Sequence, residues 1–270
     1  MDLLSSVLRS PVAEDDKYSR GVVGFVTGSE SYPGAAILGV TAAMRTGVGM
    51  VRWIGPESVG RMLLEVRPEV VLQDGKAQAW VVGSGVPTDP SDVQVENAKT
   101  HLARATFAVI DAGALEFTDF ETLTARSILT PHAGEMSRLL GRFGETWSRE
   151  QVEQNPADAV KLAARKSGQV VLLKGNVTTI ADPSGNAWNT PPANPALATA
   201  GSGDVLAGIL GALIAGNFTK IESGEIELAQ IALAGAFLHA RAGEGAAAAG
   251  PVVAMDIAES LRNVVGDLLA

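Results

Sequence analysis

Short apolar runs alternate along the chain with longer stretches in which apolar residues recur at helical spacing. Continuous apolar runs of this kind are typical of strands that are buried on both faces of a sheet. They predict strands over residues 21–26, 50–54, 79–82, 107–110, 127–129 and 170–173. The helical spacing predicts helices over residues 34–46, 91–103, 133–140, 156–166, 204–215, 225–242 and 255–265.

Two further runs, 177–181 and 187–190, flank the turn sequence Asp182-Pro-Ser-Gly-Asn186 and predict a β-hairpin. The alternation of strands and helices indicates a parallel sheet covered by helices on both faces. We therefore expect an α/β fold of three layers, with a mostly parallel central sheet flanked by helices. Its length suits one domain that spans residues 1–270.

Polar and glycine-rich segments follow five of the expected strands at their carboxyl ends. They are Thr27-Gly-Ser29, Gly83-Ser-Gly85, Asp111-Ala-Gly113, Thr130-Pro-His132 and Lys174-Gly175. In open parallel sheets, ligands bind at the edge where the carboxyl ends of the strands meet. The sequence therefore predicts one ligand site at this edge.

The segment Gly201-Ser-Gly-Asp204 precedes a long run of small and apolar residues that predicts a buried helix. Glycines let the backbone approach a ligand closely, and the first amides of a helix attract anions such as phosphate. A carboxylate beside such a site suits a base that activates a hydroxyl for attack on phosphorus. The alternative is structural, with Asp204 as a helix N-cap after an ordinary glycine loop.

Composition narrows the possible partners. The formal net charge is −9 and no block of lysine or arginine occurs, which argues against nucleic acid and anionic membranes as partners. There are no cysteines, and the three histidines are too scattered for a zinc site. The start of the chain lacks the pattern of a signal peptide, and no apolar run is long enough for a membrane span. We expect a cytoplasmic protein.

A series of motifs along the chain resembles the ADP-dependent NAD(P)H-hydrate dehydratases of the ribokinase-like superfamily over about residues 15–265. The motifs are Gly28-Ser29 with Gly34-Ala-Ala36, Val81-Val-Gly-Ser-Gly85, Val109-Ile-Asp-Ala-Gly113, Thr130-Pro-His-Ala-Gly-Glu135, Lys174-Gly-Asn-Val-Thr178 and Ala200-Gly-Ser-Gly-Asp-Val-Leu-Ala-Gly208. The resemblance implies a ribokinase-like fold. It also implies cofactor repair, in which the S-epimer of hydrated NADH or NADPH loses water while ADP becomes AMP and phosphate, with Mg²⁺ present.

The resemblance also implies roles for individual residues. Asp204 is the expected base, and we expect the helix start and a bound Mg²⁺-nucleotide to keep its carboxyl ionised at neutral pH. The amides of Gly201, Ser202 and Gly203 form the expected anion hole. ADP would be bound by Lys174, Gly175, Asn176, Val177, Thr178 and Gly203. The hydrated cofactor would meet Ala35, Gly85, His132 and Asp204.

The roles of two acidic residues, Glu135 and Asp111, each have two possible interpretations. Glu135 is either a capping carboxylate for its helix or a ligand of the metal through water. Asp111 resembles the acidic residue that superfamily members carry at a strand end, in a structural or a functional role. The chain departs from the family pattern at Pro87, where a glycine is usual and could contact substrate.

The resemblance implies a homo-oligomer, such as a tetramer, and a separate epimerase that supplies the substrate. Two other functions remain open at this point. One is a ribokinase-like small-molecule kinase of the thiazole or pyrimidine type, which would transfer the γ-phosphoryl group of ATP. The other is a catalytically silent nucleotide-binding relative, although the presence of Lys174, Gly203 and Asp204 argues against it.

Overall fold

The computed structural model describes residues 3–270, and its centre is an eight-stranded sheet in the order β2-β1-β3-β4-β5-β6-β7-β8. The strands β1 to β6 run parallel, and the hairpin strands β7 and β8 are antiparallel. Their bounds are β1 (Val22–Val26), β2 (Met50–Trp53), β3 (Ala79–Val82), β4 (Phe107–Ile110), β5 (Arg126–Leu129), β6 (Val170–Leu173), β7 (Thr179–Ala181) and β8 (Ala187–Asn189). The predicted strands and hairpin are confirmed.

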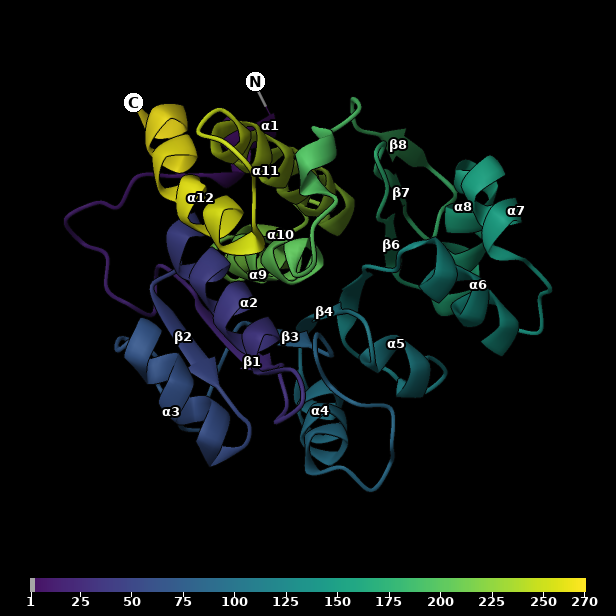
Figure 1. The fold of residues 1–270 in the computed structure, drawn as a ribbon, viewed down its shortest axis with the longest axis horizontal. Helices are drawn as coiled ribbons and strands as arrows, with labels where there is room; N and C mark the ends of the chain where they lie inside the picture. Colours follow the sequence, from purple (N-terminus) through teal and green to yellow (C-terminus); the bar gives the residue numbers. More distant parts are fainter. Residues whose placement is uncertain (1–2) are drawn as a thin grey trace.

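Helices cover both faces of this sheet, as expected (Figure 1). One face carries α1 (Leu3–Val7), α2 (Pro33–Thr46), α9 (Ser202–Gly216), α11 (Leu228–Ala247) and α12 (Ala254–Leu269). The other carries α4 (Val93–Arg104), α5 (Ala114–Phe117), α6 (Ala133–Arg142), α7 (Arg149–Gln154) and α8 (Pro156–Ser167). The remaining elements are α3 (Glu57–Val66), η1 (Pro195–Leu197) and α10 (Phe218–Glu222).

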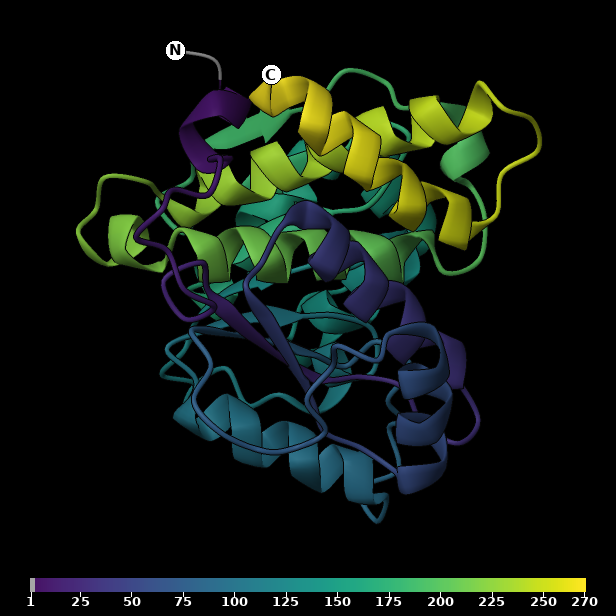
Figure 2. The same ribbon diagram turned by 90° about the vertical axis from the view of Figure 1, so that its left-hand side faces the viewer.

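Each face of the sheet has its own apolar core, because the parallel strands are buried on both sides. All residues of β1, β3, β4 and β6 are buried, as continuous apolar runs predict. Figure 2 shows α9, α11 and α12, in green to yellow, together on one side of the strands. No helix within residues 3–270 is long and apolar enough to cross a membrane.

Close packing of α2 against α9 holds the start of α9 at the carboxyl edge of the sheet. A Cβ atom on Gly208 would lie 2.1 Å from the carbonyl oxygen of Gly39, so the two helices meet backbone to backbone. The rest of α9 is apolar and almost entirely buried. The glycines and alanines of this helix therefore serve the close approach of two helices, and they hold its first residues, from Ser202, at the carboxyl ends of the strands.

The helix α3 was not predicted, although its sequence is amphipathic. Val59 and Leu63 are buried on one face, and the charged residues Glu57, Arg61 and Glu65 are exposed. The short helices α1, α5, α7 and α10 were also missed, and each has six residues or fewer.

Candidate active site

Three neighbouring strands bring Asp111, His132 and Lys174 together at the predicted edge. Asp111 directly follows β4, and Lys174 directly follows β6. The loop after β5 pairs with the segment after β6, because the amide of Lys174 donates to the carbonyl of Pro131 at 2.8 Å. The parallel order β4-β5-β6 therefore brings residues that are far apart in the chain together in one cluster.

Asp111 is an ionised carboxylate deep in the protein, with 2% of its surface exposed. Its Oδ1 accepts from Lys174 Nζ at 2.7 Å and from Thr130 Oγ1 at 2.8 Å, and its Oδ2 accepts from Ser84 Oγ at 2.8 Å. Burial alone would raise the pKa of Asp111, but the Lys174 charge and these hydrogen bonds hold that pKa below its usual value. The next residue, Ala112, has a φ of 45°, a strained backbone of the kind found at functional sites.

Lys174 links this carboxylate to the start of α9. Its Nζ also lies 3.6 Å from Glu135 Oε2, so two carboxylates face one ammonium group. Burial lowers the pKa of Lys174, but the charges of Asp111 and Glu135 outweigh it and raise that pKa above its usual value. A Cβ atom on Gly203 would lie 3.4 Å from the same Nζ, so the cation sits beside the glycine loop.

His132 and Glu135 cap the start of α6. The imidazole Nδ1 of His132 accepts from the amide of Gly134 at 3.0 Å, and Glu135 Oε2 accepts from the amide of His132 at 2.8 Å. The capping interpretation of Glu135 is therefore confirmed. Burial, the largest influence, lowers the pKa of His132, so the ring is mostly neutral at pH 7. Since its Nδ1 accepts, the neutral ring carries its proton on Nε2, which lies 3.4 Å from Glu135 Oε1.

The start of α9 offers backbone donors to an anion. Gly201 has a φ of 89°, in the left-handed region that favours glycine, and turns the chain into the helix. The amides of Gly201, Gly203 and Asp204 have no hydrogen-bond partner among residues 3–270. The amide of Ser202 instead donates to the carbonyl of Thr199 at 3.3 Å, so of the three amides predicted for the anion hole it alone has a partner within the described residues.

Asp204 lies in the first turn of α9, where Gly201 takes the N-cap position, so the N-cap interpretation of Asp204 is wrong. The helix start alone does not keep the carboxyl of Asp204 fully ionised at neutral pH. Burial and the negative charge of Asp111 raise the pKa of Asp204 to about 7, although Lys174 lowers it. A carboxyl with this pKa exchanges its proton readily at neutral pH, which suits a general base.

A cavity of about 620 Å³ opens beside this cluster, between the loop after β6, the start of α9 and the middle of α11. Its size suits a nucleotide. It brings together His132, Lys174, Gly175, Asn176, Thr178, Ser202 and Gly203 from the predicted site. Val177 lines a neighbouring cavity of about 640 Å³ instead, together with His132, Arg149 and Asn176.

Ala35 and Gly85 lie together at the ends of β1 and β3, outside the 620 Å³ cavity. A Cβ atom on Gly85 would lie 2.7 Å from the Cβ of Ala35, and the φ of Gly85 is 66°. Both features require glycine at position 85. Pro87, the departure from the family pattern, lines a third cavity of about 520 Å³ beside Glu135 and Gly113.

Sequence reasoning missed three side chains of the site. Ser84 and Thr130 hold Asp111, and both stand within motifs whose other members were singled out. His239, on α11, lines the 620 Å³ cavity, and its Nε2 lies 3.1 Å from Ser202 Oγ. Ser84 and Thr130 could have been found as hydroxyls at strand ends. For His239, the only signal is a histidine within an apolar helical pattern, which is usually a packing residue.

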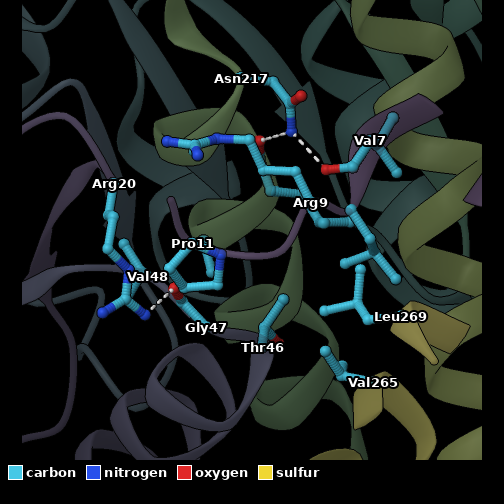
Figure 3. A pocket seen from close by; sticks show the side chains of 14 residues that line it. Val7, Arg9, Pro11, Arg20, Thr46, Gly47, Val48, Asn217, Val265 and Leu269 are labelled. Atoms are coloured by element: carbon cyan, nitrogen blue, oxygen red, sulfur yellow. Dashed lines mark hydrogen bonds between the residues drawn. The ribbon is translucent and has the colours of Figure 1, made fainter. Parts of the chain in front are cut away.

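A smaller cavity lies at the opposite edge of the sheet, where the strands begin (Figure 3). Its volume of about 100 Å³ is too small for a nucleotide. Its polar groups already have partners, since Asn217 Nδ2 donates to the carbonyls of Val7 and Leu213, and Arg20 donates to that of Gly47. This cavity therefore does not compete with the carboxyl edge as a nucleotide site.

Comparison with known proteins identifies the family. Residues 23–263 match the family of NAD(P)H-hydrate dehydratases. The chain belongs to this family. An ADP-dependent (S)-NAD(P)H-hydrate dehydratase of Neisseria meningitidis is 34% identical over 286 residues, which cover 96% of this chain and 92% of that protein. Bifunctional NAD(P)H-hydrate repair enzymes of two mycobacteria are 38–39% identical, and this chain spans about half of their length.

Solved structures of the dehydratase family and its superfamily share the fold. The ADP/ATP-dependent NAD(P)H-hydrate dehydratase of Bacillus subtilis, co-crystallised with ATP and Mg²⁺, aligns with a TM-score of 0.83 at 28% identity, over 98% of this chain and 95% of that one. A ribokinase-like superfamily protein of Enterococcus faecalis aligns with a TM-score of 0.81 at 23% identity, over 99% and 94%. The predicted ribokinase-like fold is confirmed.

Proposed function

We propose that this protein removes water from the S-epimer of hydrated NADH or NADPH, with conversion of ADP to AMP and phosphate. The observation that carries the proposal is the position of Asp204. It is a carboxyl with a pKa of about 7, next to a free helix-start amide and close to Lys174. This cluster borders a cavity of nucleotide size. A base, an anion site and a cation in one place are what phosphoryl transfer to a hydroxyl requires.

ADP would bind in the 620 Å³ cavity with its phosphates toward the start of α9. The free amides of Gly201, Gly203 and Asp204 would donate to phosphoryl oxygens there. Gly175, Asn176 and Thr178 would contact the nucleotide along the loop after β6, and Val177 would contribute through its backbone. Lys174 neutralises Asp111 and keeps the phosphate region from being dominated by carboxylates.

Asp204 would take the proton of the hydroxyl on C6 of the hydrated ring as that oxygen bonds to the β-phosphorus of ADP. The bond from this phosphorus to the α–β bridging oxygen breaks, and AMP leaves. The ring nitrogen lone pair then expels phosphate from C6, and loss of the C5 proton restores the reduced nicotinamide ring. Ala35, Gly85 and His132 would contact the hydrated cofactor, with His132 Nε2–H as a donor.

A magnesium ion fits this site only through water and the nucleotide. Asp111 already accepts three hydrogen bonds, and Glu135 is committed to the α6 cap. Within the described residues, no group of three or more acidic or histidine side chains could hold a metal. We propose that Mg²⁺ is held by phosphate oxygens and water molecules, with Glu135 contacting one of those waters. When bound, it neutralises phosphate charge.

We propose further that residues 1–270 act as one domain in the cytoplasm, as a homo-oligomer such as a tetramer. A separate epimerase would convert the other hydrate epimer into substrate. Light scattering of the purified protein measures the oligomeric state, and a monomer at micromolar concentration would contradict that part of the proposal.

Incubation with chemically prepared NADH-hydrate and ADP tests the function. We expect the absorbance of the reduced nicotinamide ring to return, with AMP and phosphate formed in equal amounts. ATP serves as the parallel nucleotide, and we expect it to support slower turnover than ADP. Phosphorylation of a thiazole or pyrimidine alcohol by ATP, without hydrate repair, would instead favour a kinase. ADP binding with neither reaction would favour a catalytically silent relative.

A further inference from the structure

His239 and Ser202 form a polar pair within an otherwise apolar part of the nucleotide cavity. The helix α11 presents Ala236, His239 and Ala240 to this cavity, so His239 is the polar side chain of that helix surface. Its Nε2 lies 3.1 Å from Ser202 Oγ. Ser202 is the first residue of α9 and is 7% exposed. The pair therefore joins α11 to the point where phosphate is expected to bind.

The imidazole of His239 is neutral at physiological pH. Burial, the largest influence, and the nearby charge of Lys174 lower the pKa of His239 to about 4, although a hydrogen bond to the backbone of Ser202 raises it. A neutral imidazole has one N–H and one lone pair. The hydrogen bond can therefore run in either direction. The hydroxyl of Ser202 donates to Nε2, or Nε2–H donates to Ser202 Oγ.

The direction matters for an anion at the start of α9. If the Ser202 hydroxyl donates its hydrogen to His239, only the lone pairs of Ser202 Oγ can face a phosphate. These lone pairs repel the negatively charged phosphate. If His239 donates to Oγ, the hydroxyl hydrogen is free to point at a phosphoryl oxygen. The amide of Ser202 is already bonded to Thr199, so the side chain is the donor that this residue has left.

We propose that His239 is a positioning residue that donates Nε2–H to Ser202 Oγ and so directs the Ser202 hydroxyl onto a nucleotide phosphoryl oxygen. The inference rests on the proposed binding of ADP in this cavity. It gives Ser202 a side-chain role in place of its backbone role, and it gives His239 a role beyond packing. This arrangement does not strengthen the binding of a nucleoside, because a nucleoside has no phosphate to accept the hydrogen bond.

Calorimetric binding of ADP and of adenosine tests the inference. We expect Ser202→Ala and His239→Leu each to raise the Kd of ADP about 10-fold, since a hydrogen bond to a charged group is lost. The Kd of adenosine should change less than about 2-fold. The double variant should bind ADP no more weakly than the weaker single variant, because both remove the same interaction. His239→Gln, whose amide can donate to Oγ, should recover most of the affinity.

His101→Leu is the matched control. His101 is a buried imidazole at 4% exposure that packs on Trp80 on the other face of the sheet, outside the nucleotide cavity. It should lower the melting temperature without changing the Kd of ADP. Unchanged ADP affinity in folded His239→Leu, or equal losses for ADP and adenosine, would overturn the inference. Failure of the wild-type protein to bind ADP would instead overturn the proposed function.

Nitrogen-15 spectra of the imidazole in the wild-type protein with ADP keep the inference testable if His239→Leu does not fold. We expect the proton of His239 on Nε2. A spectrum of the tautomer with the proton on Nδ1 would overturn the proposed direction of the hydrogen bond.

Discussion

Lys174 Nζ lies 2.7 Å from Asp111 Oδ1 and joins the ends of β6 and β4 across the intervening strand β5. Glu135 and Asp204 surround the same ammonium group, so three carboxyl groups share one cation. Three negative charges around one positive charge are unfavourable in a buried site. Burial and the repulsion from Asp111 raise the pKa of Asp204 to about 7, while the pKa of Asp111 stays below its usual value.

Asp111→Asn should destabilise the protein by about 3 kcal/mol, because removing one partner leaves a buried charge without its closest counterion. It should also lower the pKa of Asp204, since the negative charge of Asp111 raises that pKa. Urea unfolding measures the loss of stability. Asp74→Asn is the control, because Asp74 is half exposed and pairs with Arg104 at the surface, where such a loss costs about 1 kcal/mol or less. Equal losses in the two variants would contradict a special role for the Asp111–Lys174 pair.

The value of kcat/KM for hydrate repair should rise with pH and reach half of its maximum near pH 7. The base Asp204 must be deprotonated to accept the hydroxyl proton, and its pKa is about 7. Initial rates between pH 5.5 and 8.5 at fixed ionic strength measure this profile. In Asp111→Asn the midpoint should move to lower pH. A flat profile, or a midpoint that does not move in that variant, would show that another group controls the rate.

Much of the fold and of the site was predictable because it depends on local pattern. The runs at β1, β3, β4 and β6 are apolar throughout, and the polar residues Asp111, His132 and Lys174 that follow β4, β5 and β6 meet at one edge of the sheet as predicted. Contacts between distant residues were not predictable in this way. Asp111 and Lys174 are 63 positions apart, and Ser202 and His239 are 37 positions apart. No spacing rule connects such pairs, because strand order and helix packing bring them together.

The raised pKa of Asp204 could not be predicted for the same reason. The helix start, which is visible in the sequence, favours the charged form. Burial and the charges of Asp111 and Glu135, which depend on tertiary structure, favour the neutral form and raise the pKa to about 7. Lys174 lines the nucleotide cavity, but its contact with Asp111 was not expected from the sequence.

Gly203→Ala should leave the fold intact but raise the Kd of ADP at least about 10-fold. The added methyl group would lie 3.4 Å from Lys174 Nζ, which is an ordinary van der Waals distance, so the fold has room for it. The same methyl group would occupy space beside the free amide where a phosphoryl oxygen is expected. Calorimetry with ADP measures the affinity, and circular dichroism melting measures the fold.

Gly208→Ala is the matched contrast on the same helix. Its methyl group would lie 2.1 Å from the carbonyl oxygen of Gly39, and neither backbone can yield easily. We expect a loss of about 2 kcal/mol or more in stability, with ADP affinity retained by the folded protein. If Gly203→Ala binds ADP like the wild-type protein, close approach of phosphate to this glycine is wrong.

Asp204→Asn should lower kcat for hydrate repair by about 10²–10⁴-fold, the usual effect of removing a positioned general base. The Kd of ADP should change little, because the amides at the start of α9 and the loop after β6 remain. Rates and calorimetric binding on one preparation separate the two quantities. Near-wild-type turnover would show that Asp204 is not the base, and lost ADP binding would make it a nucleotide ligand.

The same variant should be more stable than the wild-type protein at pH 8. The pKa of Asp204 is raised from 3.8 to about 7, so the folded state binds its proton more tightly than the unfolded state does. The free energy of unfolding therefore falls as pH rises from about 4 to 7, and the loss is complete above 7. Asparagine does not titrate, so Asp204→Asn avoids this loss, which is on the order of 2–4 kcal/mol. Urea unfolding at pH 8 and pH 5 measures the difference, and we expect a much smaller gain at pH 5. An equal change at both pH values would show that the carboxyl of Asp204 is not held in an unfavourable charged state.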